Sequence, residues 1–176
     1  IGLRFFSKND MDMVFSLAHQ IKHENLMPDL VGKTVAHVFF EPSTRTRLSF
    51  EMATQKSQAF PMILDVKNSS LTKGESLIDM MKNIESLGVN GLIIRHSNGG
   101  IPFYISQHVT IPVLNAGDGY HEHPSQGLLD IFTLKEHLGD LKGKHVLILG
   151  DIRHSRVAKS NIWGLLKMGA KVTVSG

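Results

Sequence analysis

Residues 34–47 read Thr34-Val35-Ala36-His37-Val38-Phe39-Phe40-Glu41-Pro42-Ser43-Thr44-Arg45-Thr46-Arg47. The first seven residues are mostly apolar and predict a strand, while Leu48–Ala53 continue as a helix after a tight turn. A helix N-terminus attracts anions through its free N–H groups and its partial positive charge. The two threonines of this turn add hydroxyl donors, and its two arginines add charge and planar donor geometry. The segment therefore suits a phosphate group, although an ordinary N-capped helix with two solvated arginines would give the same pattern.

Strand-like and helix-like patterns alternate along the rest of the chain. Such βα repeats predict an α/β fold with a parallel sheet and helices on both faces. A capping box at Thr72 and Glu75 is expected to start one helix, and Pro102 can open a short helix at its first position. Further strands are expected at 60–66, 91–95, 112–115, 145–149 and 171–175, further helices at 11–21, 43–57, 77–87, 128–138 and 155–168, and a loop at 116–124.

A break in the organisation of the chain is expected at Gly139–Lys144, whose composition is that of a linker. The prediction is a first domain at 1–139 and the start of a second, truncated α/β domain at 140–176. The second part holds a single βαβ unit, so its apolar strands lack sheet neighbours. Exposed strands of this kind predict aggregation or swapping.

Composition limits the possible functions. The chain has 176 residues, of which 41% are apolar and 20% charged, as expected for a globular protein with a core. No apolar run approaches the ~20 residues of a membrane span, and a signal-peptide layout is absent, so a cytoplasmic protein without membrane contact is expected. Zero cysteines exclude disulfides and thiolate metal sites. The net charge of +3 suits small anionic ligands. The high pI is the only feature that favours nucleic-acid binding, since the sequence has neither Lys/Arg clusters nor aromatic ladders.

Polar clusters directly follow several predicted strands: Ser43–Arg47, Arg95 and the loop that contains His123. The carboxyl ends of parallel strands meet at one edge of a sheet, where α/β proteins bind their ligands. Gln126 follows His123 by one helical turn, so these groups are expected to converge. Taken singly, Arg95 can also be a surface arginine and His123 an ordinary loop histidine.

Two long motifs resemble those of the aspartate and ornithine carbamoyltransferases. Phe40–Arg47 together with Ser49-Phe50-Glu51 resembles the carbamoyl-phosphate motif, and His123-Pro124-Ser125-Gln126 with Leu128-Leu129-Asp130 resembles the second family motif. Ser70–Glu75 is similar to the mobile loop of the aspartate branch. The ornithine enzymes usually carry a cysteine in the second motif, whereas this chain has none. The resemblance covers essentially the whole chain and favours the aspartate branch.

The resemblance implies transfer of a carbamoyl group from carbamoyl phosphate to the amine of L-aspartate, a step of de novo pyrimidine biosynthesis, without cofactor or metal. Ser70 and Lys73 would enter the site of a neighbouring subunit in a homotrimer, and Lys73 and Arg156 would bind aspartate. Regulatory chains or a dihydroorotase are possible further partners. The residues implied to bind carbamoyl phosphate are Ser43, Thr44, Arg45, Thr46, Arg95, His123 and Gln126, and the implied catalytic residues are Arg45, Thr46, Lys73, Arg95 and His123. Arg47 is expected to support the motif instead.

The chain departs from the family after the linker, where the family's second domain is far longer. The further residues that complete the amino-acid pocket are not present, so the chain alone is expected to bind phosphate ligands weakly and to turn over little. Two alternative functions remain open: a carbamoyltransferase that acts on ornithine or another amine, and a non-catalytic phosphate-binding module. Without the resemblance, Lys73 and Arg156 could also be ordinary solvated side chains.

Overall fold

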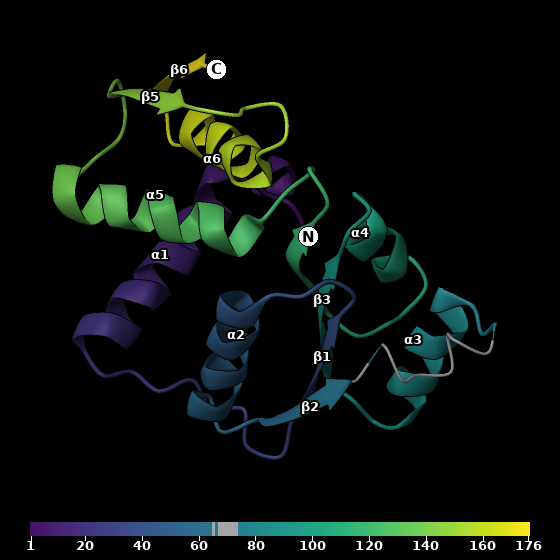
Figure 1. Cartoon of the computed structure of the whole chain (residues 1–176). Helices are drawn as coiled ribbons and strands as arrows, with labels where there is room; N and C mark the ends of the chain where they lie inside the picture. Colours follow the sequence, from purple (N-terminus) through teal and green to yellow (C-terminus); the bar gives the residue numbers. More distant parts are fainter. Residues whose placement is uncertain (65, 67–73) are drawn as a thin grey trace.

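Two parallel sheets organise the part of the chain that the structure, a computed structural model, describes: residues 1–64, 66 and 74–176. Within these residues, four strands form one sheet in the order β2-β1-β3-β4, and two form a second, β5-β6 (Figure 1). The strands are β1 (Thr34–Phe39), β2 (Phe60–Leu64), β3 (Gly91–His96), β4 (Val113–Asp118), β5 (His145–Leu149) and β6 (Lys171–Ser175). The α/β fold predicted from the alternating pattern is confirmed.

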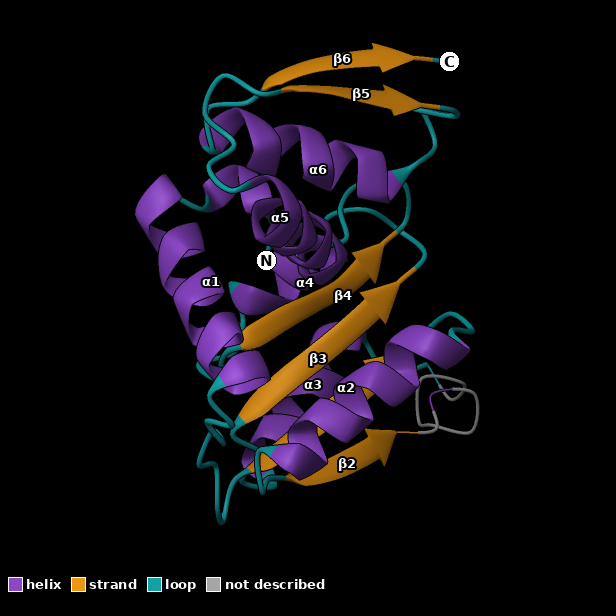
Figure 2. Ribbon diagram, turned by 90° about the vertical axis from the view of Figure 1, so that its left-hand side faces the viewer, coloured by secondary structure: helices purple, strands orange, loops and turns teal. Residues whose placement is uncertain are grey.

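The register of the larger sheet brings the ends of its central strands together. Phe39 of β1 pairs with Arg95 of β3, and Ile94 of β3 pairs with Asn115 of β4. All these pairings are parallel, so the loops that leave β1, β3 and β4 lie at one edge (Figure 2). The polar clusters that follow the predicted strands were expected at this same edge.

Helices cover both faces of this sheet (Figure 1). Helices α3 (Leu77–Ser86) and α4 (Ile101–Ser106) lie on one face, and α2 (Thr44–Lys56) lies on the other. The face under α3 and α4 is an apolar core made of Ala36, Val38, Met80, Met81, Ile84, Val89, Leu92, Ile94, Ile105 and Val113. On the α2 face, the buried His37 ring lies 3.1 Å from the Thr54 hydroxyl, which connects the sheet to the helix.

A second core joins the start of the chain to its last third. It is formed by the 3-10 turn Leu3–Phe5, α1 (Lys8–His23), α5 (Pro124–Leu138), α6 (Arg156–Lys167) and the inner face of β5 and β6. Its buried members are Leu3, Met11, Phe15, Ile131, Leu141, Leu165, Met168 and Ala170. Packing therefore crosses the predicted linker at Gly139–Lys144, because α1 and α5 share this core with α6.

Several element ends differ from the sequence predictions. Helix α3 begins at Leu77, and its N-cap is Ser76, whose hydroxyl accepts from the Asp79 N–H. The expected cap Thr72 lies outside the described residues. Helix α4 begins at Ile101, which leaves Pro102 at its second position. Strand β4 runs on to Asp118, into the predicted loop, because side-chain hydrogen bonds satisfy its buried polar residues.

None of the described helices combines the length and the hydropathy that crossing a bilayer requires.

Candidate active site

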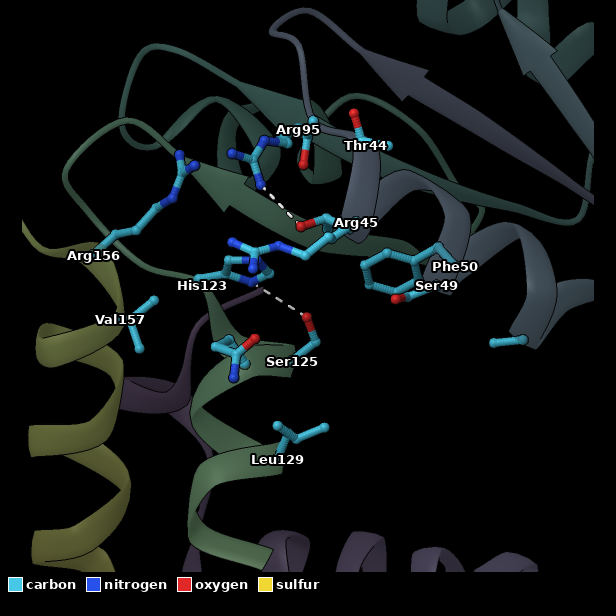
Figure 3. A pocket seen from close by; sticks show the side chains of 14 residues that line it. Thr44, Arg45, Ser49, Phe50, Arg95, His123, Ser125, Leu129, Arg156 and Val157 are labelled. Carbon is cyan, nitrogen blue, oxygen red and sulfur yellow. Dashed lines mark hydrogen bonds between the residues drawn. The ribbon is translucent and has the colours of Figure 1, made fainter. Parts of the chain in front are cut away.

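A cleft of about 1000 Å³ opens at the carboxyl edge of the larger sheet. The N-terminus of α2 forms one wall, and the N-termini of α5 and α6 form the other (Figure 3). Its lining residues are Ser43, Thr44, Arg45, Thr46, Ser49, Phe50, Ala53, Arg95, His123, Ser125, Gln126, Leu129, Arg156 and Val157. Most of the charge along this lining is positive, since it includes three arginines and no carboxylate.

The first turn of α2 supplies the anion-binding half of the cleft. Ser43 is the N-cap in extended conformation, and its side chain does not cap the helix, so the hydroxyl stays available to a ligand. The N–H groups of the next residues have no acceptor within the helix, as at every helix start. Together with the helix dipole and the Arg45 guanidinium, they favour a phosphate-sized anion.

Arg95 links the end of β3 to this turn. Its Nη1 donates to the Thr46 hydroxyl at 3.2 Å and to the Ala116 carbonyl at 3.4 Å. Its Nε lies 2.6 Å from Oε1 of Glu41 in an ion pair. Burial and then the nearby Arg156 charge lower the pKa of Arg95. The two guanidiniums thus repel each other, and an anion between them is favoured.

Glu41 partly offsets this repulsion. Its Oε1 also accepts from Nη2 of Arg156 at 2.8 Å, so one carboxylate oxygen serves both arginines. Arg156 is further held by its Nη1, which donates to the Gly119 carbonyl at 3.2 Å. Gly119 has φ of +50°, and a Cβ there would lie 2.5 Å from the Ser97 carbonyl oxygen, so this close turn requires glycine.

His123 precedes the first turn of α5 and is 7% exposed. Its backbone N–H donates to the buried Ser160 hydroxyl at 2.9 Å, and its Nδ1 lies 3.3 Å from the Ser125 hydroxyl (Figure 3). Burial, helped by the charges of Arg156 and Arg95, lowers the pKa of His123 to about 4. The imidazole is therefore neutral at neutral pH and can donate one hydrogen bond.

Gln126 is fixed one turn further along α5. Its Nε2 donates to Oδ1 of Asp130 at 2.8 Å, while Nδ2 of Asn161 on α6 donates to the other oxygen at 2.8 Å. Asp130 therefore connects the two helices just below the cleft and limits the rotamers of Gln126.

A buried carboxylate supports the loop before His123. Oδ1 of Asp118 accepts from the Glu122 N–H and from Nδ2 of Asn115, both at 3.0 Å. Its Oδ2 accepts from the Gly100 N–H at 2.7 Å and lies 2.8 Å from Nδ1 of His121. This network orients the loop, and hence His123, from outside the cleft.

The structure brings most of the predicted site residues to this one cleft: Ser43, Thr44, Arg45, Thr46, Arg95, His123, Gln126 and Arg156. Arg47 is not in the lining, and its Nε donates to Glu51 at 2.6 Å on the exposed side of α2. Ser70 and Lys73 lie outside the described residues. The sequence places Glu41, Ser49, Phe50, Ser125 and Leu129 in the family motifs but assigns none of them an individual role, and it gives no signal for Val157. The position of Glu41 could have indicated a place near the cleft, because Glu41 directly follows the predicted strand at 34–40.

A cationic cleft at the carboxyl edge of a parallel sheet defines the class: an α/β protein built to hold a small phosphorylated or carboxylated ligand. Residues 1–136 match the family model of the aspartate/ornithine carbamoyltransferase, carbamoyl-P binding domain. The chain belongs to the aspartate/ornithine carbamoyltransferase family, which confirms the resemblance seen in its motifs.

Individual relatives show the same relationship. The chain is 48% identical to the aspartate carbamoyltransferase catalytic subunit of Carboxydothermus hydrogenoformans and 50% identical to that of Opitutus terrae, in each case over 100% of this chain and 58% of the relative. The chain thus spans somewhat more than half the length of these relatives.

Solved structures also resemble this fold. Aspartate transcarbamoylase from Trypanosoma cruzi in complex with carbamoyl phosphate and aspartate superimposes with a TM-score of 0.87 at 28% identity, over 99% of this chain and 55% of that one. Ornithine carbamoyltransferase from Thermus thermophilus gives 0.90 at 30% identity, over 99% and 60%.

Proposed function

We propose that the protein containing this chain transfers the carbamoyl group of carbamoyl phosphate to the amine of L-aspartate, giving N-carbamoyl-L-aspartate and phosphate. The observation that carries the proposal is the convergence of Arg45, Arg95, Arg156 and a neutral His123 on one cleft at a helix N-terminus. Aspartate is preferred as the acceptor because relatives that are 48% and 50% identical over the whole chain are aspartate carbamoyltransferase catalytic subunits.

The donors of the cleft fit the charges of this reaction. The amine attacks the carbamoyl carbon, so negative charge develops on the carbonyl oxygen and then on the departing phosphate. Thr46, Arg95 and His123 serve the carbonyl oxygen. Ser43, Thr44, Arg45 and the N-terminus of α2 serve the phosphate. One donor placed in this way typically lowers a barrier by ~3–4 kcal/mol.

The neutral imidazole matters for its role. A hydroxyl of Ser125 that donates to Nδ1 of His123 keeps the ring proton on Nε2, which then donates to the carbonyl oxygen. Gln126 accepts from the carbamoyl nitrogen, and Arg156 binds a carboxylate of aspartate. Both ligands then compete with Glu41 for Arg95 and Arg156, because its Oε1 contacts each guanidinium.

We further propose the wider setting that the family resemblance implies. The protein acts in the cytoplasm as a homotrimer in which Ser70 and Lys73 complete a neighbouring site, and regulatory chains or a dihydroorotase are candidate partners. Residues 1–139 form the carbamoyl-phosphate-binding domain, and 140–176 begin the aspartate-binding domain. The 176-residue chain alone binds carbamoyl phosphate weakly and does not turn over.

Binding is tested by calorimetric titration of carbamoyl phosphate into the purified chain and two arginine variants. Arg45→Ala removes a guanidinium in the cleft and is expected to weaken binding about 10- to 100-fold, the range for losing a charged hydrogen bond. Arg47→Ala is the matched control, since Arg47 lies one half-turn away and pairs with Glu51. Equal affinities for the two variants would contradict the assignment of the cleft.

Substrate choice is tested with the natural gene product in its full length. Carbamoyl phosphate is supplied with L-aspartate or with L-ornithine, and the carbamoylated product is followed by mass spectrometry. Product from aspartate alone supports the proposal, whereas product from ornithine favours the other branch. Tight binding of carbamoyl phosphate without product from either amine would support a non-catalytic phosphate-binding module.

A further inference from the structure

Three metal-ligating side chains gather where α1 passes α5, at the opposite end of α5 from His123. They are His19 and His23 on α1 and Glu136 on α5, and one ligand atom of each lies within 4.8 Å of the others. Among the residues that the structure describes, no other three histidine, aspartate or glutamate side chains are grouped so closely. The proposed carbamoyl transfer makes no use of them.

The two histidines are arranged by helix geometry. Residues four apart lie on the same helix face one turn apart, and the His19 and His23 ring centroids are 4.6 Å apart. Glu136 approaches from the neighbouring helix, with its Oε1 2.8 Å from Nε2 of His23. Helix α1 crosses α5 in the fold (Figure 1), and the two meet at this cluster.

The cluster is accessible from solvent. It lines a groove of about 720 Å³ between the two helices, whose floor includes Phe15 and Phe132. These rings pack 6.1 Å apart in the second core, so the backbones that carry the three ligands are held in place from below. An ion can therefore enter without unfolding either helix.

We propose that His19, His23 and Glu136 bind one divalent transition-metal ion of the Zn²⁺ type, which ties α1 to α5. Two imidazole nitrogens and one carboxylate oxygen, with water as the fourth ligand, form a tetrahedral set that Zn²⁺ commonly takes. Imidazole ligands suit Zn²⁺, Ni²⁺ and Cu²⁺, whereas Mg²⁺ prefers oxygen ligands alone.

The charges around the cluster permit this arrangement. Lys22 donates to Oε2 of Glu136 at 2.6 Å and keeps the carboxylate oriented, so that Oε1 can bind an ion that replaces its contact with Nε2 of His23. The other nearby ammonium, Lys135, is 3.0 Å from Asp12, which offsets its charge.

The rival interpretation is a simple surface clamp, in which Lys22 and His23 hold Glu136 without any ion. His19 distinguishes the two, because the hydrogen bonds to Glu136 come from Lys22 and His23. The clamp gives His19 no part, whereas a metal ion requires its imidazole.

The test is calorimetric titration of ZnCl₂ into chelator-treated chain at neutral pH, repeated with MgCl₂. One Zn²⁺ site and no Mg²⁺ site are expected. His19→Gln and His23→Gln should each weaken Zn²⁺ binding by at least about tenfold. The matched control is His154→Gln, since His154 is exposed and pairs with a single carboxylate, Asp151. Circular dichroism confirms that each variant is folded.

Equal Zn²⁺ affinity in the unmodified chain and in His19→Gln would overturn the proposal and leave the clamp. A loss in His154→Gln as large as in His19→Gln would also overturn it, because binding would then lie elsewhere. The expected result has a second readout: at the same Zn²⁺ concentration, the thermal midpoint of the unmodified chain rises more than that of His19→Gln, because tighter binding to the folded state stabilises it more.

Discussion

His123 combines the burial of a core residue with the position of a ligand-binding one. Its backbone N–H is anchored to Ser160, so its ring can remain buried while one ring nitrogen stays available. Protonation would place a third positive charge beside Arg95 and Arg156 in a poorly solvated place. The folded protein therefore strongly prefers the neutral ring, which links this residue to the pH dependence of folding.

Acidification is expected to destabilise the chain through His123. Its pKa is about 4 when folded, below the ordinary histidine value of 6.5, so the unfolded state binds more protons between these values. The free energy of unfolding should thus fall as pH drops from 6.5 towards 4, by up to about 3 kcal/mol from this residue. Urea denaturation at pH 7.0, 5.5 and 4.5 measures the effect.

His123→Gln provides the control for that series. Glutamine keeps a polar side chain but cannot titrate, so the variant should show a shallower loss of stability over the same range. An equally steep loss in the variant would mean that other groups, such as the carboxylates, govern the acid response.

The sequence could predict that the polar side chains after the strands meet at one edge of the sheet. It could not predict which of these side chains contact each other. Ser43–Arg47, Arg95 and His123 each follow a strand, and parallel topology then places them together. The role of Glu41 cannot be predicted from sequence, because its partner Arg156 lies 115 positions along the chain and only the fold brings them together. Sequence spacing carries no information about such a contact.

At the level of elements, α5 and α6 approach closely because two glycines face the contact. A Cβ on Gly127 would lie 2.8 Å from Cδ1 of Leu3 and 2.9 Å from Cβ of Ser160. A Cβ on Gly164 would overlap Cδ1 of Ile131 and crowd Leu3 and Met11. The helices can therefore only pack at this distance if both positions lack side chains.

Gly164→Ala is expected to destabilise the chain although alanine is the better helix former. The higher helix propensity of alanine stabilises the fold by ~1 kcal/mol, whereas overpacking a closed core typically destabilises it by ~1–3 kcal/mol. Ile131→Val removes the Cδ1 atom that the new methyl group would meet, so it should relieve part of the loss. Chemical denaturation of both single variants and the double variant measures this coupling. Strictly additive losses would show that Ile131 is not the obstacle.

The elements themselves were largely predictable because their apolar periodicity reflects burial. The limits of β1, β5 and α6 agree with the sequence to within one or two residues. Several boundaries differed from the predictions, two of them for clear local reasons. Asp118 reads as a loop residue but lies in β4, since its carboxylate accepts neighbouring N–H groups. Ser76 caps α3, whereas the expected cap Thr72 lies outside the described residues, and two hydroxyl residues in one polar stretch could not be ranked without the fold.

At the scale of the whole molecule, the small sheet leaves an apolar face uncovered. Val146, Ile148 and Val172 face the second core, while Leu147 and Leu149 point away from it and are 55% and 71% exposed. Two strands with an open edge and an open face tend to pair with other copies. The association expected from the sequence for residues 140–176 stays a prediction.

Leu149→Lys is therefore expected to reduce concentration-dependent association of the 176-residue chain, because a charge on the open face disfavours contact between copies. Sedimentation velocity over a range of concentrations measures it. Leu87→Lys is the matched control: Leu87 is 72% exposed but lies at the end of α3, away from the small sheet. Similar effects of both substitutions would indicate a general gain in solubility and no specific role for the β5-β6 face.

Helix α5 belongs to both halves of the molecule: its N-terminus presents His123 and Gln126 to the larger sheet, and its body packs in the second core. A rotation of α5 within the second core therefore also moves its N-terminus at the cleft. A helix of 15 residues is roughly 22 Å long, so a tilt of ~5° about its far end moves its tip by roughly 2 Å. A small displacement of α5 in the second core would therefore change the position of His123 relative to Arg95. The distance between these two groups thus depends on packing far from the ligand-binding cleft.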